Sequence, residues 1–516
     1  MPFVRKYLPL FLLLIAPAAQ GQTIAASAAV RIPVEHDRRM LVRTAASEAL
    51  LEEGRRAIAD FRIRDAERAF TRLANLPDGR PAGLYNLTFA AFLTYLVSDR
   101  PEDLDLFELR SHELKQELDD LPDSPWRALL GAETNLQRAV VRAKTGRYVR
   151  AALAARTAYH EFERIVREYP ELDDAHKGYG ALKVAIGSLP ATYQRFLSLV
   201  GFQGSVQDGV NSLNRAIESS SFSADEATIV LAIVHTVLLE PSDGATLMQR
   251  MAAKYPESVL VNHVSGYVLL ESRRARDAER AFEKAIANGD GPGAQSIDYS
   301  TYFLGLARFR LNDFNGAVTA LSDYLVMHDA PALRASSELV MGVSLEMLGD
   351  RSAAVDHYRR VEVAREFDLD AVSRRRAERL SLHPMDATER ELQLGANDFD
   401  AGNYEEAIVR LVHVSQEASA TDDQIAEAHY RLGRAFQVTA RLEDALKNYA
   451  AAISRTTDPM SRWAPWSEYY SGRIHEAAGR RAEAIDAYRR ALDYSGSYDY
   501  YQSLEQNVRL ALVRLK

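Results

Sequence analysis

The stretch GRAFQVTARLEDALKNYAAA, residues 433–452, decides the fold. Ala445, Tyr449 and Ala452 follow one another at intervals of four and three residues, so they lie on one face of a helix. Gly433 falls on the helix before it. Small side chains at Gly433 and Ala445 let two antiparallel helices approach closely, and Tyr449 fills the space beside their contact. The stretch therefore predicts a helical hairpin.

The same spacing recurs along the chain. A Gly is followed by an Ala after twelve residues, by a large residue after four more, and by a residue of variable size after three more. Between the two helices, Gly349 and Gly402 are typical of the left-handed turn that ends a helix. One hairpin cannot bury its apolar face alone, so neighbouring hairpins must stack. The seven units are marked by Gly54, Gly266, Gly305, Gly342, Gly395, Gly433 and Gly472.

These units resemble the tetratricopeptide repeat (TPR) family. That family has Gly or Ala at position 8 of the repeat, Ala at 20, a large residue at 24 and Ala at 27, and all seven units match at 8 and 20. The aromatic residue usual at position 4 is replaced here by residues such as Glu391, His429 and Glu468. The resemblance implies an all-α fold, a right-handed superhelical solenoid of antiparallel helix pairs that binds partners.

Between residues 81 and 258 the pattern degrades but stays helical. Ala151, Ala155 and Ala158 predict the second helix of a degenerate unit, and Gly209 with Leu213 marks another. We expect the following segments: a signal peptide (1–21), a linker with the start of the first helix (22–46), an N-terminal TPR-like and irregular helical region (47–258), three repeats (259–363), a helical insertion (364–388), three repeats (389–496) and a C-terminal capping helix (497–516).

A shorter resemblance covers the middle and the end of the chain. Leu189-Pro190, the run from Leu199 to Gly204, and the closing Tyr500-Tyr501 with Leu510-Ala511-Leu512 are similar to the inclusion-body-clearance family of eukaryotic TPR proteins. This resemblance implies architecture only.

The first residues predict export. Arg5 and Lys6 precede an apolar run from Leu8 to Ala19, and Ala19-Gln20-Gly21 supplies small residues where a signal peptidase cleaves. The alternative is an uncleaved anchor, but twelve residues are too few to cross a bilayer, which takes about 20. We expect an exported, soluble chain, periplasmic if the source is bacterial.

Composition and scattered motifs give little support to catalysis. The chain has no Cys, which excludes disulfides and thiolate metal sites, and its net charge of −9 argues against nucleic acid as the main partner. His112-Glu113 and His475-Glu476 begin a zinc motif but lack its second His. We expect no metal, no cofactor and no enzyme activity. The run Arg374-Arg375-Arg376 either grips an anionic partner or is a solvated helix face, which its acidic neighbours favour.

Tyr, Trp and Arg are enriched at binding hot spots. The TPR resemblance implies that positions 2, 5, 9 and 12 of each first helix face a concave groove. We expect a protein or peptide to bind there, as part of cell-envelope assembly or export. The competing interpretation is that these side chains fill gaps between repeats. A second hypothesis is a carrier that holds a lipid, glycan or other small molecule in the irregular region 81–258. The candidate groove residues are Tyr267, Tyr299, Tyr302, Phe309, Tyr430, Arg434, Trp466, Tyr469 and Arg473.

Overall fold

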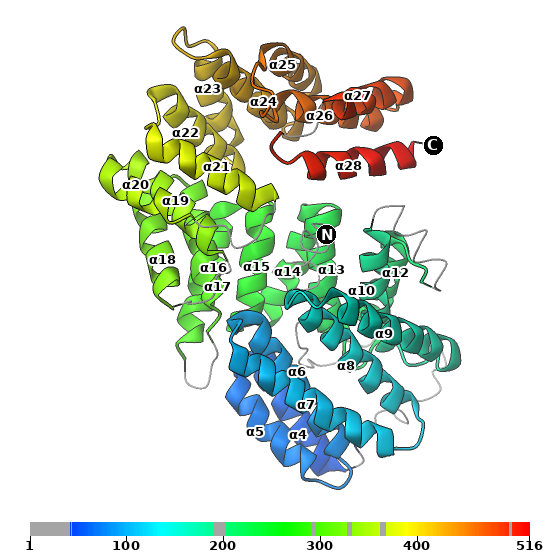
Figure 1. Cartoon of the computed structure of the whole chain (residues 1–516). Helices are drawn as coiled ribbons and strands as arrows, with labels where there is room; N and C mark the ends of the chain where they lie inside the picture. Colours follow the sequence, from blue (N-terminus) through cyan, green and yellow to red (C-terminus); the bar gives the residue numbers. More distant parts are fainter. Residues whose placement is uncertain are drawn as a thin grey trace. The chain divides into compact units, whose positions relative to one another are not determined.

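The computed structural model describes residues 42, 44–189, 202–291, 296–327, 333–361, 368–494 and 498–515. All regular secondary structure in these ranges is α-helical, so the predicted all-α class is confirmed (Figure 1). The signal peptide expected at 1–21 lies outside these ranges, as does most of the linker expected at 22–46.

The chain divides into two compact units. The first comprises residues 1–272 and 280–300, and the second comprises 273–279 and 301–516. The division therefore runs through α16 and the start of α17. Most of the first unit's helices pair with the next helix along the chain. Its helices are α4 (Ala45–Ala59), α5 (Ile63–Ala74), α6 (Arg80–Ser98), α7 (Pro101–Asp120), α8 (Pro125–Lys144), α9 (Tyr148–Glu168), α10 (Ala175–Gly187), α12 (Val206–Ser219), α13 (Ala224–Leu238), α14 (Pro241–Lys254), α15 (Val259–Glu271) and most of α16 (Ala275–Gly289).

The second unit contains the more regular repeats and the end of the chain. Its helices are most of α17 (Asp298–Arg310), α18 (Phe314–Met327), α19 (Arg334–Met347), α20 (Arg351–Arg359), α21 (Asp368–Leu382), α22 (Ala387–Ala401), α23 (Tyr404–Ser415), α24 (Asp422–Val438), α25 (Leu442–Arg455), α26 (Trp463–Ala477), α27 (Arg481–Asp493) and α28 (Tyr501–Arg514).

The repeat glycine is the point of closest approach within each hairpin. A Cβ on Gly433 would lie 2.4 Å from the Tyr449 ring, so any larger residue would force the two helices apart. The same clash would occur in all seven units, at 2.3–3.0 Å from the large residue sixteen positions later. The predicted close contact of small residues is confirmed, and the large side chain lies over the glycine itself.

Seven residues after each repeat glycine the backbone turns left-handed. The φ angles there lie between 56° and 94°, which ends the first helix and reverses the chain. The prediction for Gly349 and Gly402 is confirmed, and the other units make the same turn with other residues. The seven positions are Phe61, Arg273, Asn312, Gly349, Gly402, Ala440 and Gly479.

Polar pairs occupy the place of the family's aromatic residue at position 4. In the second unit these residues reach across to the second helix of their own hairpin. The pairs are Glu338 with His357 at 2.7 Å, Glu391 with Arg410 at 3.2 Å, His429 with Asn448 at 2.9 Å, and Glu468 with Arg490 at 2.9 Å.

The irregular region keeps the hairpin plan. Helices α6 and α7, α8 and α9, α10 and α12, and α13 and α14 each pack as pairs. Gly180 and Gly209 face each other across the α10–α12 pair, because a Cβ on either would lie within 2.8 Å of the other's carbonyl oxygen. The helices predicted from Ala151 and from Gly209 are present as α9 and α12.

Two elements outside the repeats match their predicted places. The extra helix expected within 364–388 is α21, and the final helix expected within 497–516 is α28. Leu504, Val508 and Ala511 of α28 are buried against α27 and α26, so this helix covers the apolar side of the last hairpin.

Candidate functional site

The nine predicted groove residues do not all belong to one unit. Tyr267 and Tyr299 lie in the first unit and the other seven lie in the second. In the first unit, Tyr267 is half-buried against the core, and the Tyr299 hydroxyl donates to the Asp99 carboxylate, which also pairs with Lys144. Both side chains therefore take part in packing within that unit.

Two predicted residues at the start of the second unit are also used internally. The side chain of Tyr302 is only 4% exposed, and its hydroxyl lies 2.8 Å from Ser336 Oγ on the next repeat. Phe309 is half-buried, with its ring centroid 5.9 Å from that of Phe314. For these two residues the geometry favours the interpretation that they fill gaps between helices.

The last two hairpins carry an aromatic cluster. Tyr469 is 6% exposed, and its ring lies 5.6 Å from Trp466, 5.1 Å from Tyr470 and 5.9 Å from Tyr488 between ring centroids. Tyr430 is similarly buried, 6.2 Å from Tyr470. Tyr430 and Tyr469 thus form the buried base of the cluster, at the junction between neighbouring repeats.

Arginine and half-buried rings lie above this base. The Arg434 guanidinium stacks 3.8 Å above the Tyr470 ring centroid and lies 5.8 Å from that of Phe399. Burial raises the pKa of Tyr470 to about 12, even though Arg434 lowers it, so the phenol stays neutral. A neutral ring presents its electron-rich face to the guanidinium, which holds Arg434 in one orientation.

Two further side chains complete an accessible patch. Trp466 is half-buried, and its indole Nε1–H is buried without a hydrogen-bond partner among the described residues. Arg473 is exposed and reaches the Tyr469 hydroxyl at 3.4 Å. We call Arg434, Trp466, Tyr470 and Arg473 the C-terminal aromatic surface. Three of its members are predicted groove residues. Tyr470 was missed, because the family pattern assigns its repeat position to neither groove nor core.

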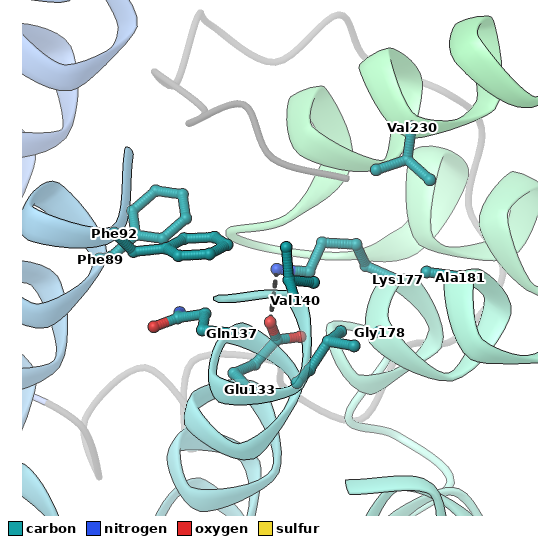
Figure 2. Close-up of a pocket in the computed structure, with 10 residues that line it drawn as sticks. Phe89, Phe92, Glu133, Gln137, Val140, Lys177, Gly178, Ala181 and Val230 are labelled. Carbon is teal, nitrogen blue, oxygen red and sulfur yellow. Dashed lines mark ion pairs between the residues drawn. The ribbon is translucent and has the colours of Figure 1, made fainter. Parts of the chain in front are cut away.

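A second cluster lies in the irregular region of the first unit. Lys177 on α10 is buried between two carboxylates. It lies 2.8 Å from Glu133 on α8 (Figure 2) and 2.6 Å from Glu226 on α13. Burial opposes the charge on Lys177, but the two carboxylates outweigh it and hold its pKa well above the ordinary value. Arg55 lies 3.9 Å from Glu226, which balances the charges of the cluster. The spacing of residues in the sequence did not predict this charge cluster, because its members are far apart in the chain.

The charge cluster borders a small cavity. Phe89 and Phe92 form its apolar wall (Figure 2). One oxygen of Glu133 and both amide atoms of Gln137 are buried and have no hydrogen-bond partner in the described part of the chain. The space admits about one water molecule. A lipid or glycan could enter only if the helices that line the cavity moved apart. The cavity therefore does not support the hypothesis of a lipid or glycan carrier, which stays a prediction.

The basic run on α21 is engaged within its own unit. Arg374 lies 3.7 Å from Glu378, Arg375 pairs with Asp499, and Arg376 donates to Gln393 at 2.5 Å. Arg375 is exposed, as the predicted solvated helix face requires, whereas Arg376 is half-buried and departs from that prediction.

Metal binding and membrane spanning have no structural signal in the described ranges. No group of three or more His, Asp or Glu side chains there is arranged to hold a metal ion. Likewise, no described helix combines the length and apolar character that crossing a bilayer requires.

Residues 174–292, a range that includes helices α10 to α16, match the Iml2/Tetratricopeptide repeat protein 39 family. The predicted resemblance to TPR proteins is confirmed. The match includes the run from Leu199 to Gly204 that suggested the second resemblance, part of which lies outside the described residues, and it ends well before Tyr500. The fold is thus of a type that suggests a protein–protein interaction scaffold.

Solved structures similar to the chain are also repeat proteins. A tetratricopeptide repeat protein from Parabacteroides merdae is 9% identical, with a TM-score of 0.24, and the match covers 55% of this chain and 98% of that one. Yeast Tom70 is 11% identical, with a TM-score of 0.31, covering 85% of this chain and 89% of that one. These likenesses are too distant to bear on function.

Proposed function

We propose that the chain is a scaffold that acts by binding and not by catalysis, and that it holds a protein or peptide partner on the C-terminal aromatic surface. The observation that carries this proposal is the Arg434 guanidinium held on the Tyr470 ring, beside the half-buried Trp466 ring. Arg and Trp side chains on a rigid base are typical of binding hot spots, since little side-chain entropy is lost when the partner arrives.

The chemistry of the surface favours a particular kind of segment. The half-buried Trp466 offers part of its apolar ring, and the exposed Arg473 guanidinium favours a carboxylate. A peptide that offers an apolar side chain and a nearby Asp or Glu would match both. We further propose that the partner belongs to the cell envelope, which rests on the predicted signal peptide.

The test is capture of crosslinked partners by the full chain from the cells that produce it. We expect Trp466→Ala combined with Arg473→Ala to reduce capture of the enriched proteins at least about tenfold, the usual effect of removing hot-spot side chains. Far-UV circular dichroism should stay unchanged, because Trp466 is half-buried and Arg473 is exposed.

Two controls separate binding from folding. Arg489→Ala changes an exposed Arg on the neighbouring helix α27 and should leave capture unchanged. Tyr469→Ala removes the buried base and should lower helical content together with capture. Capture by the double variant at the level of the unmodified chain would refute this surface as the binding site.

A further inference from the structure

The outer face of α9 carries apolar side chains that no described residue of its own unit covers. Val149 is 74% exposed and Leu153 is 59% exposed, and the two lie one helical turn apart. The opposite face of the same helix buries Tyr159 and Phe162 in the core, so α9 is held firmly from behind. Val149 and Leu153 therefore form an exposed apolar pair on the side of α9 that faces away from the core.

Basic residues without acidic partners surround these two side chains. Arg150 and Arg156 are exposed, and within the described residues neither forms an ion pair. Nearby, the Arg142 guanidinium donates to the Arg150 carbonyl at 3.4 Å and has no carboxylate partner in those ranges. The stretch 134–160 contains six Lys and Arg residues and no Asp or Glu, in a chain whose net charge is −9.

The other basic surfaces differ in this respect. The three arginines of the α21 run contact Glu378, Asp499 and Gln393 of their own unit. The arginines at the two ends of α9 also have acidic partners. Arg147, just before the helix, lies 3.8 Å from Glu108, and near the helix end Arg164 and Arg167 both pair with Glu168. On α9 it is Arg150 and Arg156, close to Val149 and Leu153, that have no carboxylate partner among the described residues and can meet an outside anion.

We propose that the outer face of α9 docks on an anionic lipid surface, with Val149 and Leu153 entering the headgroup boundary and Arg150 and Arg156 meeting lipid phosphates. Exposed aliphatic side chains flanked by Arg are typical of a helix that lies in a membrane interface. A protein partner would require a complementary shape, whereas two projecting side chains on a convex helix face require only a soft apolar layer. This docking is independent of the C-terminal aromatic surface, which belongs to the other unit.

The test is flotation of the full chain with vesicles of phosphatidylcholine alone and with vesicles containing 30 mole per cent (about one lipid in three) phosphatidylglycerol, a share high enough to create a negative surface potential. We expect binding only to the anionic vesicles, and weaker binding as the salt concentration rises. Arg150→Gln with Arg156→Gln should weaken partitioning roughly thirtyfold, from about 1 kcal/mol for each Arg. Val149→Ser with Leu153→Ser should weaken it roughly tenfold or more, since apolar burial is lost.

Matched controls come from exposed residues elsewhere. Val409→Ser replaces a residue on α23 that is as exposed as Val149, and Arg68→Gln with Arg489→Gln removes the same charge as the double Arg variant. Both control variants should bind the anionic vesicles as the unmodified chain does. Any vesicle binding by residues 1–21 is the same in every variant, so it cannot cause a difference between them. Equal binding to both vesicle types, equal loss in the controls, or binding to polyglutamate but to neither vesicle would overturn the proposal.

Discussion

At the scale of single residues, the repeated left-handed turn shows how one backbone requirement is met by different side chains. Four of the seven turns place Phe61, Arg273, Asn312 or Ala440 at a φ that favours Gly. A residue with a Cβ costs about 1 kcal/mol or more in that conformation. The close packing of the two helices therefore imposes the turn, and the residue at the turn adopts the left-handed conformation even where it is not Gly.

The turn at Ala440 provides a stability prediction. Ala440 is exposed with φ 61°, so Ala440→Gly should raise the free energy of unfolding by roughly 0.5–1 kcal/mol through relief of backbone strain. Urea unfolding followed by circular dichroism measures the change.

The matched control is the same position one repeat later. Gly479 has φ 72° and open space around its Cα, so Gly479→Ala should lower the free energy of unfolding by about 1 kcal/mol with no steric clash involved. If both variants shifted stability in the same direction, strain at this turn would not be the cause.

At the scale of the helix pair, the large residue over the repeat glycine is matched to the residue four positions after that glycine. The hydroxyls of Tyr358, Tyr449 and Tyr488 donate to Glu346, Gln437 and Glu476, at 2.7, 2.7 and 2.5 Å. Where the large residue is Phe or Leu, the matching position is apolar. The apolar pairs are Phe70 with Ile58, Phe282 with Leu270, Leu321 with Phe309, and Leu411 with Phe399.

This matching predicts a coupled pair of substitutions. Tyr449→Phe leaves the Gln437 carbonyl without its donor and should lower the free energy of unfolding by about 1 kcal/mol or more. Tyr449→Phe with Gln437→Leu recreates the Phe282–Leu270 pair and should recover most of that loss. A double-mutant cycle by urea unfolding measures the coupling, and strictly additive losses would contradict the matching.

At the scale of the whole molecule, the two units bury their polar groups differently. The first unit has a continuous apolar core that encloses Lys177 with its two carboxylates, and it buries His176 and His263. In the second unit, several separate apolar clusters follow one another along the repeats. The first unit therefore behaves more like a globular domain, and the second more like a repeat array.

The buried histidines predict acid sensitivity of the first unit. Burial lowers the pKa of His263 to about 4, and burial with nearby Arg215 lowers that of His176 to about 4. Unfolded His titrates near 6.5, so the stability from the neutral rings is present above about pH 6.5 and is lost as the pH falls from there towards 4.

The expected loss approaches about 1.4 kcal/mol per pH unit for each His, well below pH 6.5. Hydrogen exchange measured at pH 7 and pH 5 should show α10 and α15 losing protection. His263→Gln should reduce that loss in α15, because Gln carries no titrating charge. Unchanged protection in the unmodified chain at pH 5 would rule out this linkage.

The sequence by itself determined the hairpins, their turns and the closing helix. Those features depend on contacts between residues sixteen positions apart or fewer, such as Gly433 with Tyr449, and local spacing records such contacts. The sequence also predicted Arg434, Trp466 and Arg473 of the C-terminal aromatic surface, because they occupy repeat positions that the family pattern assigns to the groove.

The tertiary structure alone decided which side chains remain accessible. Tyr302, Tyr430 and Tyr469 occupy groove positions in the sequence pattern, yet each is buried against a neighbouring helix whose position the repeat spacing does not specify. The sequence likewise did not predict the Lys177 cluster or the exposed face of α9, since burial and ion pairing depend on residues brought together from distant helices. Spacing along one helix fixes a face, but only the packed neighbours determine whether that face is covered.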